Sequence, residues 1–117
     1  MRLSDVQKII NDAGIPCYKW AVPEGIPLPH CCVAKISNGD NTVYADDGNY
    51  YPVAKCQMYA AMYDNDEQES TELRIDKALD DAGIAYRYSM GYNIAEAIVV
   101  KIYTFEIPEE VTDNEQS

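Results

Sequence analysis

Residues 51–84, YPVAKCQMYAAMYDNDEQESTELRIDKALDDAGI, decide how the rest of the chain is arranged. In the first part, small or apolar side chains alternate with an aromatic-rich set, which puts Met58 on one face of a strand and Tyr59 and Tyr63 on the other. After Tyr63 the alternation gives way to an acidic run that can cap a helix and suits its positive end. Apolar residues then recur at helical spacing until Gly83, which can adopt the left-handed conformation that ends a helix. The stretch therefore predicts a long strand followed directly by an amphipathic helix.

The remaining elements follow from the same two patterns. A short amphipathic helix is expected over residues 3–13, with Ser4 as its candidate N-cap and Gly14 at its end. Further strands are expected over residues 17–22, 31–36, 42–45, 84–90 and 95–107. The last of these is apolar on both faces, as in a strand in the middle of a sheet. We expect one α+β domain over residues 1–108, followed by an acidic, disordered tail over residues 109–117. Its architecture is a two-layer fold, an antiparallel or mixed sheet of five or six strands with two helices on one face.

Both expected helices end in the same short sequence, Asp-Ala-Gly-Ile, at residues 12–15 and 81–84. One explanation is that Gly commonly ends helices and Ile commonly starts strands. The other is that the chain contains two similar helix-to-strand units packed side by side. Both explanations place the two helices in one layer.

The charge of the chain excludes the simplest kind of nucleic-acid-binding protein. Nine basic residues are scattered among twenty acidic ones, for a formal net charge of −11. Phosphate binding needs clustered Lys and Arg, so no specific nucleic-acid binding is expected. No window approaches the roughly 18 apolar residues of a membrane span, and no membrane role is expected. Residues 1–10 lack the apolar core of a signal peptide, so we expect the protein to be made and used inside a cell.

The sequence also argues against a metal centre or an enzyme. Cys17, Cys31, Cys32 and Cys56 include no C-x-x-C motif, and the neighbours Cys31 and Cys32 would point to opposite faces of a strand. We therefore expect four buried, reduced thiols. The single histidine, His30, completes no credible Ser-His-Asp or Cys-His set, and no glycine-rich phosphate loop is present. No enzymatic activity and no cofactor are expected.

One loop of the sequence is rich in oxygen ligands. Residues 38–49 read NGDNTVYADDGN, which could supply a weak Ca²⁺ or Mg²⁺ site. The loop lacks the closing Glu and the spacing of an EF-hand, so a solvated pair of turns is the expected structure. The neighbouring acids Asp46 and Asp47 are likewise expected to be solvated and not catalytic.

Two helices can cover only one face of the predicted sheet. The expected members of the uncovered face are Tyr59, Tyr63, Tyr103, Val99 and Phe105. Such a patch would be larger than the apolar patches of most monomers, and tyrosine is enriched in protein interfaces. Either copies of the chain associate through this face, or the loops at residues 23–30 and 37–50 fold over it. We expect self-association, because monomers rarely expose a patch of this kind.

The order of features along the chain adds a family resemblance. A helix ending in AGIP, a Trp/Tyr strand and a proline-rich loop are followed by NTVYADDGNYY, the strand CQMYAAMYDNDEQE, a helix ending in LDDAGI and the strand VVKIYTFEI. Over residues 3–107 this order resembles the small tail-completion proteins of long-tailed bacteriophages and prophages, which are the tail-terminator and head–tail joining group.

The resemblance implies a non-enzymatic virion protein that is assembled in the cytoplasm of the bacterial host. It would form a ring, commonly a hexamer, at the end of the tail tube, and would contact the tail-tube protein and the head connector protein. An acidic ring suits a DNA passage because it does not grip phosphates. The loops at residues 23–30 and 37–50, with Asp46, Asp47 and Tyr51, would make subunit and tube contacts.

An alternative function is an acidic inhibitor that mimics DNA and occupies a basic site on a host or phage enzyme. Such a mimic would keep carboxylates spaced along one exposed face and act as a monomer or dimer. A ring protein would instead sediment as a larger oligomer. A third option, a small-molecule-binding regulatory domain, has no supporting residues in the sequence.

Overall fold

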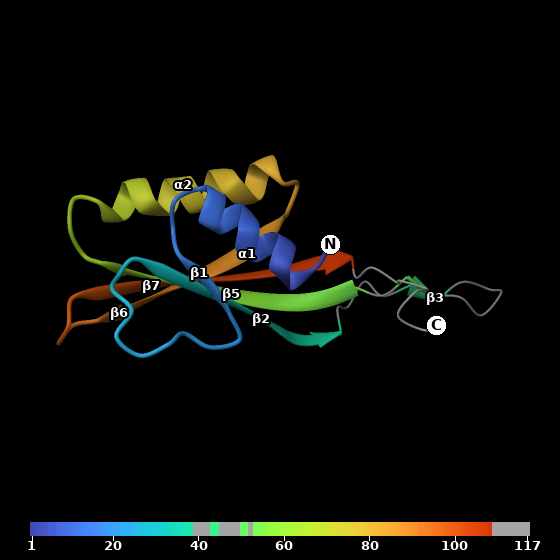
Figure 1. The fold of residues 1–117 in the computed structure, drawn as a ribbon, viewed down its shortest axis with the longest axis horizontal. Helices are drawn as coiled ribbons and strands as arrows, with labels where there is room; N and C mark the ends of the chain where they lie inside the picture. The colour runs from blue at the N-terminus through green and yellow to red at the C-terminus, as the bar shows by residue number, and fades with distance from the viewer. Residues whose placement is uncertain (39–42, 45–49, 52, 109–117) are drawn as a thin grey trace.

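The computed structural model describes residues 1–38, 43–44, 50–51 and 53–108, and it confirms the expected α+β class. The helices α1 (Leu3–Asp12) and α2 (Gln68–Asp81) form one layer on a five-stranded mixed sheet (Figure 1). In spatial order the strands are β1 (Cys17–Lys19), β2 (His30–Asn38), β5 (Val53–Tyr63), β7 (Ile98–Pro108) and β6 (Tyr86–Asn93). A separate two-stranded ladder joins β3 (Val43–Tyr44) to β4 (Tyr50–Tyr51).

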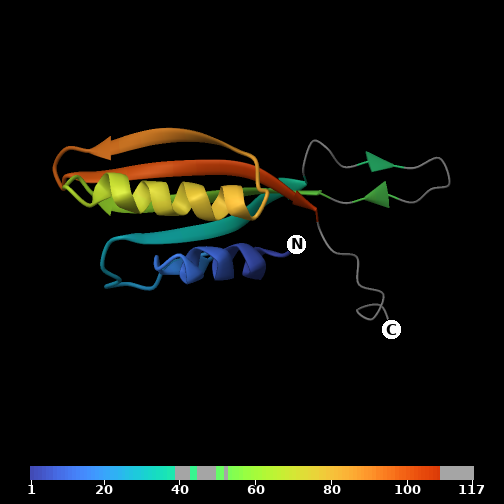
Figure 2. The same cartoon turned by 90° about the horizontal axis from the view of Figure 1, so that it is seen from above.

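The centre of the sheet is the long antiparallel pair β5–β7, which runs in register from Val53–Pro108 to Tyr63–Ile98. The strand β7 lies between β5 and β6, as its two apolar faces predict. At one edge β1 pairs parallel with β2, and at the other β6 pairs antiparallel with β7 (Figure 2).

The hydrophobic core lies between the helices and the sheet. On β5 every second residue faces this core, including Met58 and Met62, which are almost fully buried. From α2, Ile75 and Leu79 pack against them at the expected helical spacing, and both are fully buried. The core-facing residues of α1 are Val6 and Ile10, also fully buried.

The prediction that Tyr103, Val99 and Phe105 belong to the uncovered face is wrong. Tyr103 is 0% exposed and lies directly opposite the core residue Met58, so it points toward the helices. Val99 and Phe105 share this face and are also buried. Both faces of β7 are apolar, so alternation alone could not tell them apart. The pairing with β5 decides which face is the core.

Helix and strand starts differ from the expected ones for local reasons. The N-cap of α1 is Arg2, not Ser4, and the Asp5 carboxylate accepts the Arg2 N–H at 2.7 Å. Before α2, the Asn65 side chain accepts a backbone N–H at 2.9 Å, and the helix itself begins at Gln68. An Asx turn thus occupies residues that the sequence had suggested as N-caps.

The strand β1 is shorter than expected because Trp20 has a φ of 70°. This left-handed conformation takes the chain out of the extended region after Lys19. The Trp20 N–H still donates to the Val33 carbonyl at 2.9 Å, so the backbone stays attached to the sheet as it leaves it.

The repeated Asp-Ala-Gly-Ile sequences end both helices in the same way. Gly14 and Gly83 have φ values of 92° and 73°, and the isoleucines that follow return to the core, with Ile15 0% and Ile84 6% exposed. The two helices are neighbours, but β1 and β6 lie at opposite edges of the sheet. The repeat therefore does not encode two helix-to-strand units packed side by side. It reflects a Gly that ends each helix and an Ile that then packs into the core.

Two expectations concern parts of the chain outside the described residues. These are the acidic tail at residues 109–117 and most of the oxygen-rich loop at residues 38–49. Within the described ranges, neither helix combines the length and apolar character needed to cross a bilayer.

Candidate functional site

The side of the sheet opposite the helices is here called the open face. It carries the exposed aromatic residues of the central strand β5, Tyr59 and Tyr63. Register places its side chains in rows that cross the strands. One row contains Tyr18, Cys32, Tyr59, Ile102 and Ser89, the next His30, Ala61, Val100 and Gly91, and the third Tyr63, Ile98 and Asn93. These rows form a continuous apolar and aromatic surface at one end of the open face.

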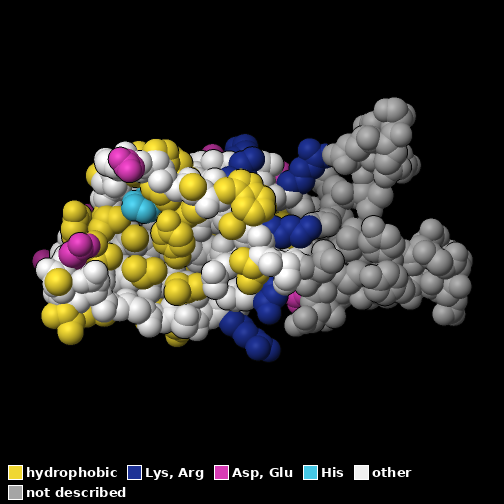
Figure 3. All heavy atoms as spheres, turned by 90° about the horizontal axis from the view of Figure 1, so that it is seen from below, with side chains coloured by type: hydrophobic (Ala, Val, Ile, Leu, Met, Phe, Trp, Pro, Cys, Tyr) yellow, Lys and Arg dark blue, Asp and Glu magenta, His cyan; other side chains and the backbone are white. Residues whose placement is uncertain are grey.

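The apolar end of the open face is only partly shielded by the chain itself. Tyr59 is 38% exposed and Tyr63 52%, while Ile98, Val100 and Ile102 are half-buried. Hydrophobic side chains gather over one half of this face, and Lys and Arg side chains follow toward the other half (Figure 3). The surface is therefore divided into an apolar end and a polar end.

The polar end is basic in character although the whole chain is acidic. Its rows contain Ala34, Gln57, Thr104 and Arg87, then Ser37, Lys55 and Glu106. In these two rows and the three apolar ones, Glu106 is the only carboxylate, whereas the chain as a whole has twenty. The strand rows of the open face thus contribute little repulsion between two copies of a chain of charge −11, and the Asp and Glu side chains seen at its apolar end come from outside these rows (Figure 3).

Tyr59 lies in the middle of the open face, next to residues of β2. Its ring lies edge-on to His30, with 6.4 Å between the ring centroids, and it stands beside Cys32 in the register. Burial raises the pKa of Tyr59, and the Cys32 thiol raises it further. Burial likewise raises the pKa of Cys32, against a smaller opposing effect of its hydrogen bond to Tyr59. Cys32 therefore stays a neutral thiol, and this part of the face is suited to packing and not to nucleophilic chemistry.

The connection between β1 and β2 does not roof the open face. Figures 1 and 2 together place it on the open side, beside the β1–β2 edge, away from β6 and β7. Its residues Val22, Ile26 and Leu28 are half-buried, so it shields that edge. The loop at residues 37–50, the other predicted cover, lies mostly outside the described residues.

The residues predicted for an interface have different positions. Tyr59 and Tyr63 lie on the open face, as predicted, and Tyr103 lies in the core. Asp46 and Asp47 are outside the described residues. For Tyr51 only the backbone is described, as part of β4.

A buried charge cluster on the helix side was missed by the sequence reasoning. Lys101, on β7, is 2% exposed, and its ammonium donates to Glu72 at 2.7 Å and to Asp76 at 3.1 Å. The Tyr103 hydroxyl donates to the same Asp76 carboxylate at 2.7 Å. The ammonium also lies 4.2 Å from the ring centroid of Tyr88. A signal was present in the sequence: a lone Lys in an apolar strand, and two acids spaced i, i+4 on one helix.

The chemistry of this cluster is structural. Burial alone would lower the pKa of Lys101, but the hydrogen bonds and charges of Glu72 and Asp76 outweigh it, and the pKa is raised. Burial and the bond to Asp76 raise the pKa of Tyr103 well above its usual range. Lys101 is therefore a permanent ammonium with its protons engaged, and it is not a nucleophilic amine.

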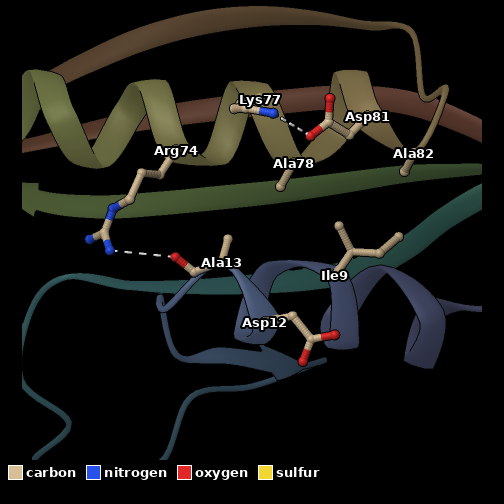
Figure 4. Close-up of a pocket in the computed structure, with 8 residues that line it drawn as sticks. All are labelled: Ile9, Asp12, Ala13, Arg74, Lys77, Ala78, Asp81 and Ala82. Atoms are coloured by element: carbon tan, nitrogen blue, oxygen red, sulfur yellow. Dashed lines mark hydrogen bonds and ion pairs between the residues drawn. The ribbon is translucent and has the colours of Figure 1, made fainter.

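A groove between the two helices is one of the concave features of the described residues (Figure 4). Its apolar walls are Ile9 and three small side chains, Ala13, Ala78 and Ala82. Along it Arg74 donates to the Ala13 carbonyl at 3.4 Å, and Lys77 pairs with Asp81 at 2.6 Å. These charged groups are already paired along the rim, so the groove presents no convergent polar set to a ligand.

Metal-ligating residues do not converge in the part of the chain that the structure describes: nowhere in it do three or more His, Cys, Asp or Glu side chains form a group suited to an ion. Comparison with known protein families finds none that matches the sequence, and comparison with curated proteins finds no match either. Among the surfaces of this chain, the open face has the clearest features of a binding surface.

Proposed function

We propose that this chain is a non-enzymatic structural protein that assembles with copies of itself through the apolar end of the open face. The observation that carries the proposal is the exposure of Tyr59 and Tyr63 beside half-buried Val100 and Ile102, on a sheet face without a helix layer. Contiguous apolar patches of this kind are uncommon on monomers, and burial against a second copy removes them from water.

The electrostatics of the chain support the same surface. Two copies that each carry a charge of −11 repel one another, and contact is least costly where carboxylates are few. The five strand rows of the open face meet this condition, since Glu106 is their only carboxylate. Lys55 and Arg87 at its polar end can in addition pair with acids of a neighbouring copy.

The resemblance described above gives this assembly a biological setting. Within the proposal, the chain is a tail terminator or head–tail joining component of a phage or prophage, a virion protein assembled in the bacterial cytoplasm. It would form a ring, in common with that group a hexamer, with the tail-tube protein on one side and the head connector protein on the other. Specific nucleic-acid binding, membrane binding and a cofactor have no part in the proposal.

A DNA-mimic inhibitor is the competing function, and the pairing of the acids makes it the weaker one. A mimic needs a row of free carboxylates along an exposed face. On α2, Glu72 and Asp76 bind Lys101, and Asp81 pairs with Lys77. Three of the acids on the most acidic helix are thus used within the chain.

The experiment is sedimentation velocity of the full chain over a range of concentrations, with Tyr63→Asp as the test variant. We expect the wild type to form oligomers and Tyr63→Asp to weaken assembly at least about tenfold, which corresponds to about 1.4 kcal/mol. The fold should persist by circular dichroism, because Tyr63 is half exposed. Leu73→Asp is the matched control: Leu73 is 67% exposed on α2, away from the open face, and its replacement should leave assembly unchanged.

The phage setting has its own test. Purified tail tubes mixed with the chain should acquire a ring at one end, visible by negative-stain electron microscopy, and the gene should lie among tail-morphogenesis genes. A wild type that remains monomeric at all concentrations and binds no tail tube would refute the proposal. Tight 1:1 binding of such a monomer to a basic DNA-processing enzyme would favour the DNA mimic.

A further inference from the structure

The outer edge of β6 is a second unprotected surface, distinct from the open face. The strand lies at the margin of the sheet, and among the described residues it pairs only with β7 (Figure 2). An edge strand exposes unpaired N–H and C=O groups that can template another strand. Natural proteins usually guard such edges with charges, prolines, bulges or very short strands.

Of these protections, β6 has only a single charge. The strand is eight residues long, contains no proline, and pairs with β7 without a register shift. Its only charged residue is Arg87, and residues 82–95 form a run of 14 residues without one acid in a chain that has twenty. An eight-residue edge with an unbroken register and a single charge is suited to strand pairing.

The side chains on the helix side of this edge are apolar and exposed. The register places Tyr88, Met90 and Tyr92 on the same side as the core residues Tyr103 and Val99. They are nevertheless 61%, 47% and 53% exposed, because the helix layer does not reach this edge. Burial of this stripe would therefore accompany the pairing of a new strand with β6.

We propose that β6 pairs antiparallel with β6 of a second copy, about a two-fold axis through Met90, so that two five-stranded sheets become one continuous sheet. The register about that axis is self-complementary. Met90 faces Met90 of the other copy, and Tyr88 faces Tyr92. Aromatic and apolar cross-strand pairs of this kind stabilise antiparallel strands.

The other side of the paired strands is also compatible with a two-fold axis. In the same register Arg87 faces Asn93 of the second copy, and Ser89 faces Gly91, so no two like charges lie opposite each other. Residues 82–95 contribute no acid to this edge, so repulsion between two copies there comes only from side chains of other segments, such as Asp64, whose carboxylate accepts the Tyr92 hydroxyl at 3.1 Å. These two features identify a second copy of this chain as the partner that pairs with the β6 edge.

The edge contact goes beyond the association through the open face, and the two can succeed or fail separately. A two-fold contact cannot join neighbours within a ring whose two faces bind different proteins, so in the phage setting it would join one ring to another. With both contacts the chain forms assemblies larger than a dimer. With the edge contact alone it forms a dimer that Tyr63→Asp does not affect.

Cysteine cross-linking of the full chain tests the two-fold axis directly, since all four native cysteines are buried. We expect Met90→Cys to give a covalent dimer under mild oxidation, seen on a non-reducing gel. Tyr88→Cys alone should not, because the two copies of residue 88 would lie four residues apart along the strands, about 13 Å, which is beyond disulfide reach. A mixture of Tyr88→Cys and Tyr92→Cys should cross-link. Leu73→Cys on α2, where the native side chain is 67% exposed against 47% for Met90, gives the rate of random collision.

A charge pair gives an independent readout. Met90→Lys and Met90→Glu should each lose the edge dimer in sedimentation, because like charges then meet on the axis, and an equimolar mixture should recover it. If the Met90→Cys variant cross-links no faster than the Leu73→Cys variant, the proposal is overturned. A strand of another protein would then be the candidate partner of the β6 edge. Failure of the Lys and Glu variants to restore a dimer when mixed would overturn the proposed register.

Discussion

Lys101 shows how a single charged residue is accommodated in the middle of an apolar strand. Its ammonium is buried, and two carboxylates on α2 and the ring of Tyr88 surround it. A buried charge is tolerated only when it is paired and hydrogen-bonded, and this one has both kinds of partner. The cluster therefore fixes the position of α2 over β7.

Replacement of Lys101 by Met should destabilise the chain. The change keeps the apolar stem but leaves Glu72 and Asp76 facing each other without a cation, and we expect the free energy of unfolding to fall by about 1–3 kcal/mol. The carboxylates keep side-chain exposures of 23% and 22%, so the loss should not exceed this range. Urea denaturation at neutral pH measures it. Lys77→Met, which removes an exposed pair with Asp81, is the control and should leave the free energy of unfolding close to that of the wild type. Equal effects of the two changes would contradict a buried role for Lys101.

Buried acidic protons make the fold sensitive to alkaline pH. Burial raises the pKa of Cys17 to about 12, and burial with the bond to Asp76 raises the pKa of Tyr103. In the unfolded chain these groups lose their protons near their ordinary values, 9.0 and 10.0, while the folded chain still holds them. The unfolded state then binds fewer protons, so stability is complete below about pH 8.5 and falls as the pH rises.

We expect each such group to remove up to about 1.4 kcal/mol per pH unit above the pKa it has in the unfolded chain. Urea denaturation at intervals from about pH 8 to about pH 11 measures the slope. Tyr103→Phe should lower stability at neutral pH through the lost hydrogen bond and make the slope above about pH 10 shallower. A free energy of unfolding that stays constant to pH 11 would show that these protons are not protected by the fold.

At the scale of one element, α2 is the part of the chain that the sequence predicts best. Its apolar residues at helical spacing identify the buried face, and Leu79, in the last turn, is fully buried on it. We expect Leu79→Ala to cost about 2–5 kcal/mol in the free energy of unfolding, through lost burial and a residual cavity. Leu73→Ala, at an exposed position of the same helix, should cost less than about 0.5 kcal/mol. A change near zero for Leu79→Ala would place the core on another face of the helix.

For other helix ends and strand faces, sequence patterns predict the structure less well. Gly83 correctly marks the end of α2, because a positive φ at that position favours glycine. The start of α2 was less predictable, since several polar residues can cap and tertiary contacts choose among them. For β7 the two faces are equally apolar, so the sequence alone could not show that Tyr103 faces the core and Ile102 the open side. That choice depends on pairing with β5, which is a contact between distant parts of the chain.

At the scale of the whole molecule, the same distinction explains which candidate site residues were found. The period-two pattern of a single strand placed Tyr59 and Tyr63 together on the open face. The Lys101 cluster joins residues about 25 to 29 positions apart, so the lone Lys and the two acids at i, i+4 are visible in the sequence but their contact is not. The β6 edge is likewise defined by the order of strands in the sheet, although its lack of acidic residues is visible in the sequence.

The net charge of −11 separates the two candidate functions by their response to salt. Self-association brings like-charged copies together at apolar surfaces, so it should strengthen as salt screens their repulsion. A DNA mimic bound to a basic enzyme gains from attraction between opposite charges, so its complex should weaken under the same change. Between about 0.01 M and about 0.15 M salt the Debye length falls from about 30 Å to about 8 Å, which makes this the informative range. We expect the average mass of the chain in sedimentation equilibrium to rise across it. Tyr63→Asp, which adds a carboxylate to the open face, should need more salt than the wild type to reach the same mass. A mass that falls with added salt would instead indicate that oligomers are held together by charge, and would remove the open face as their cause.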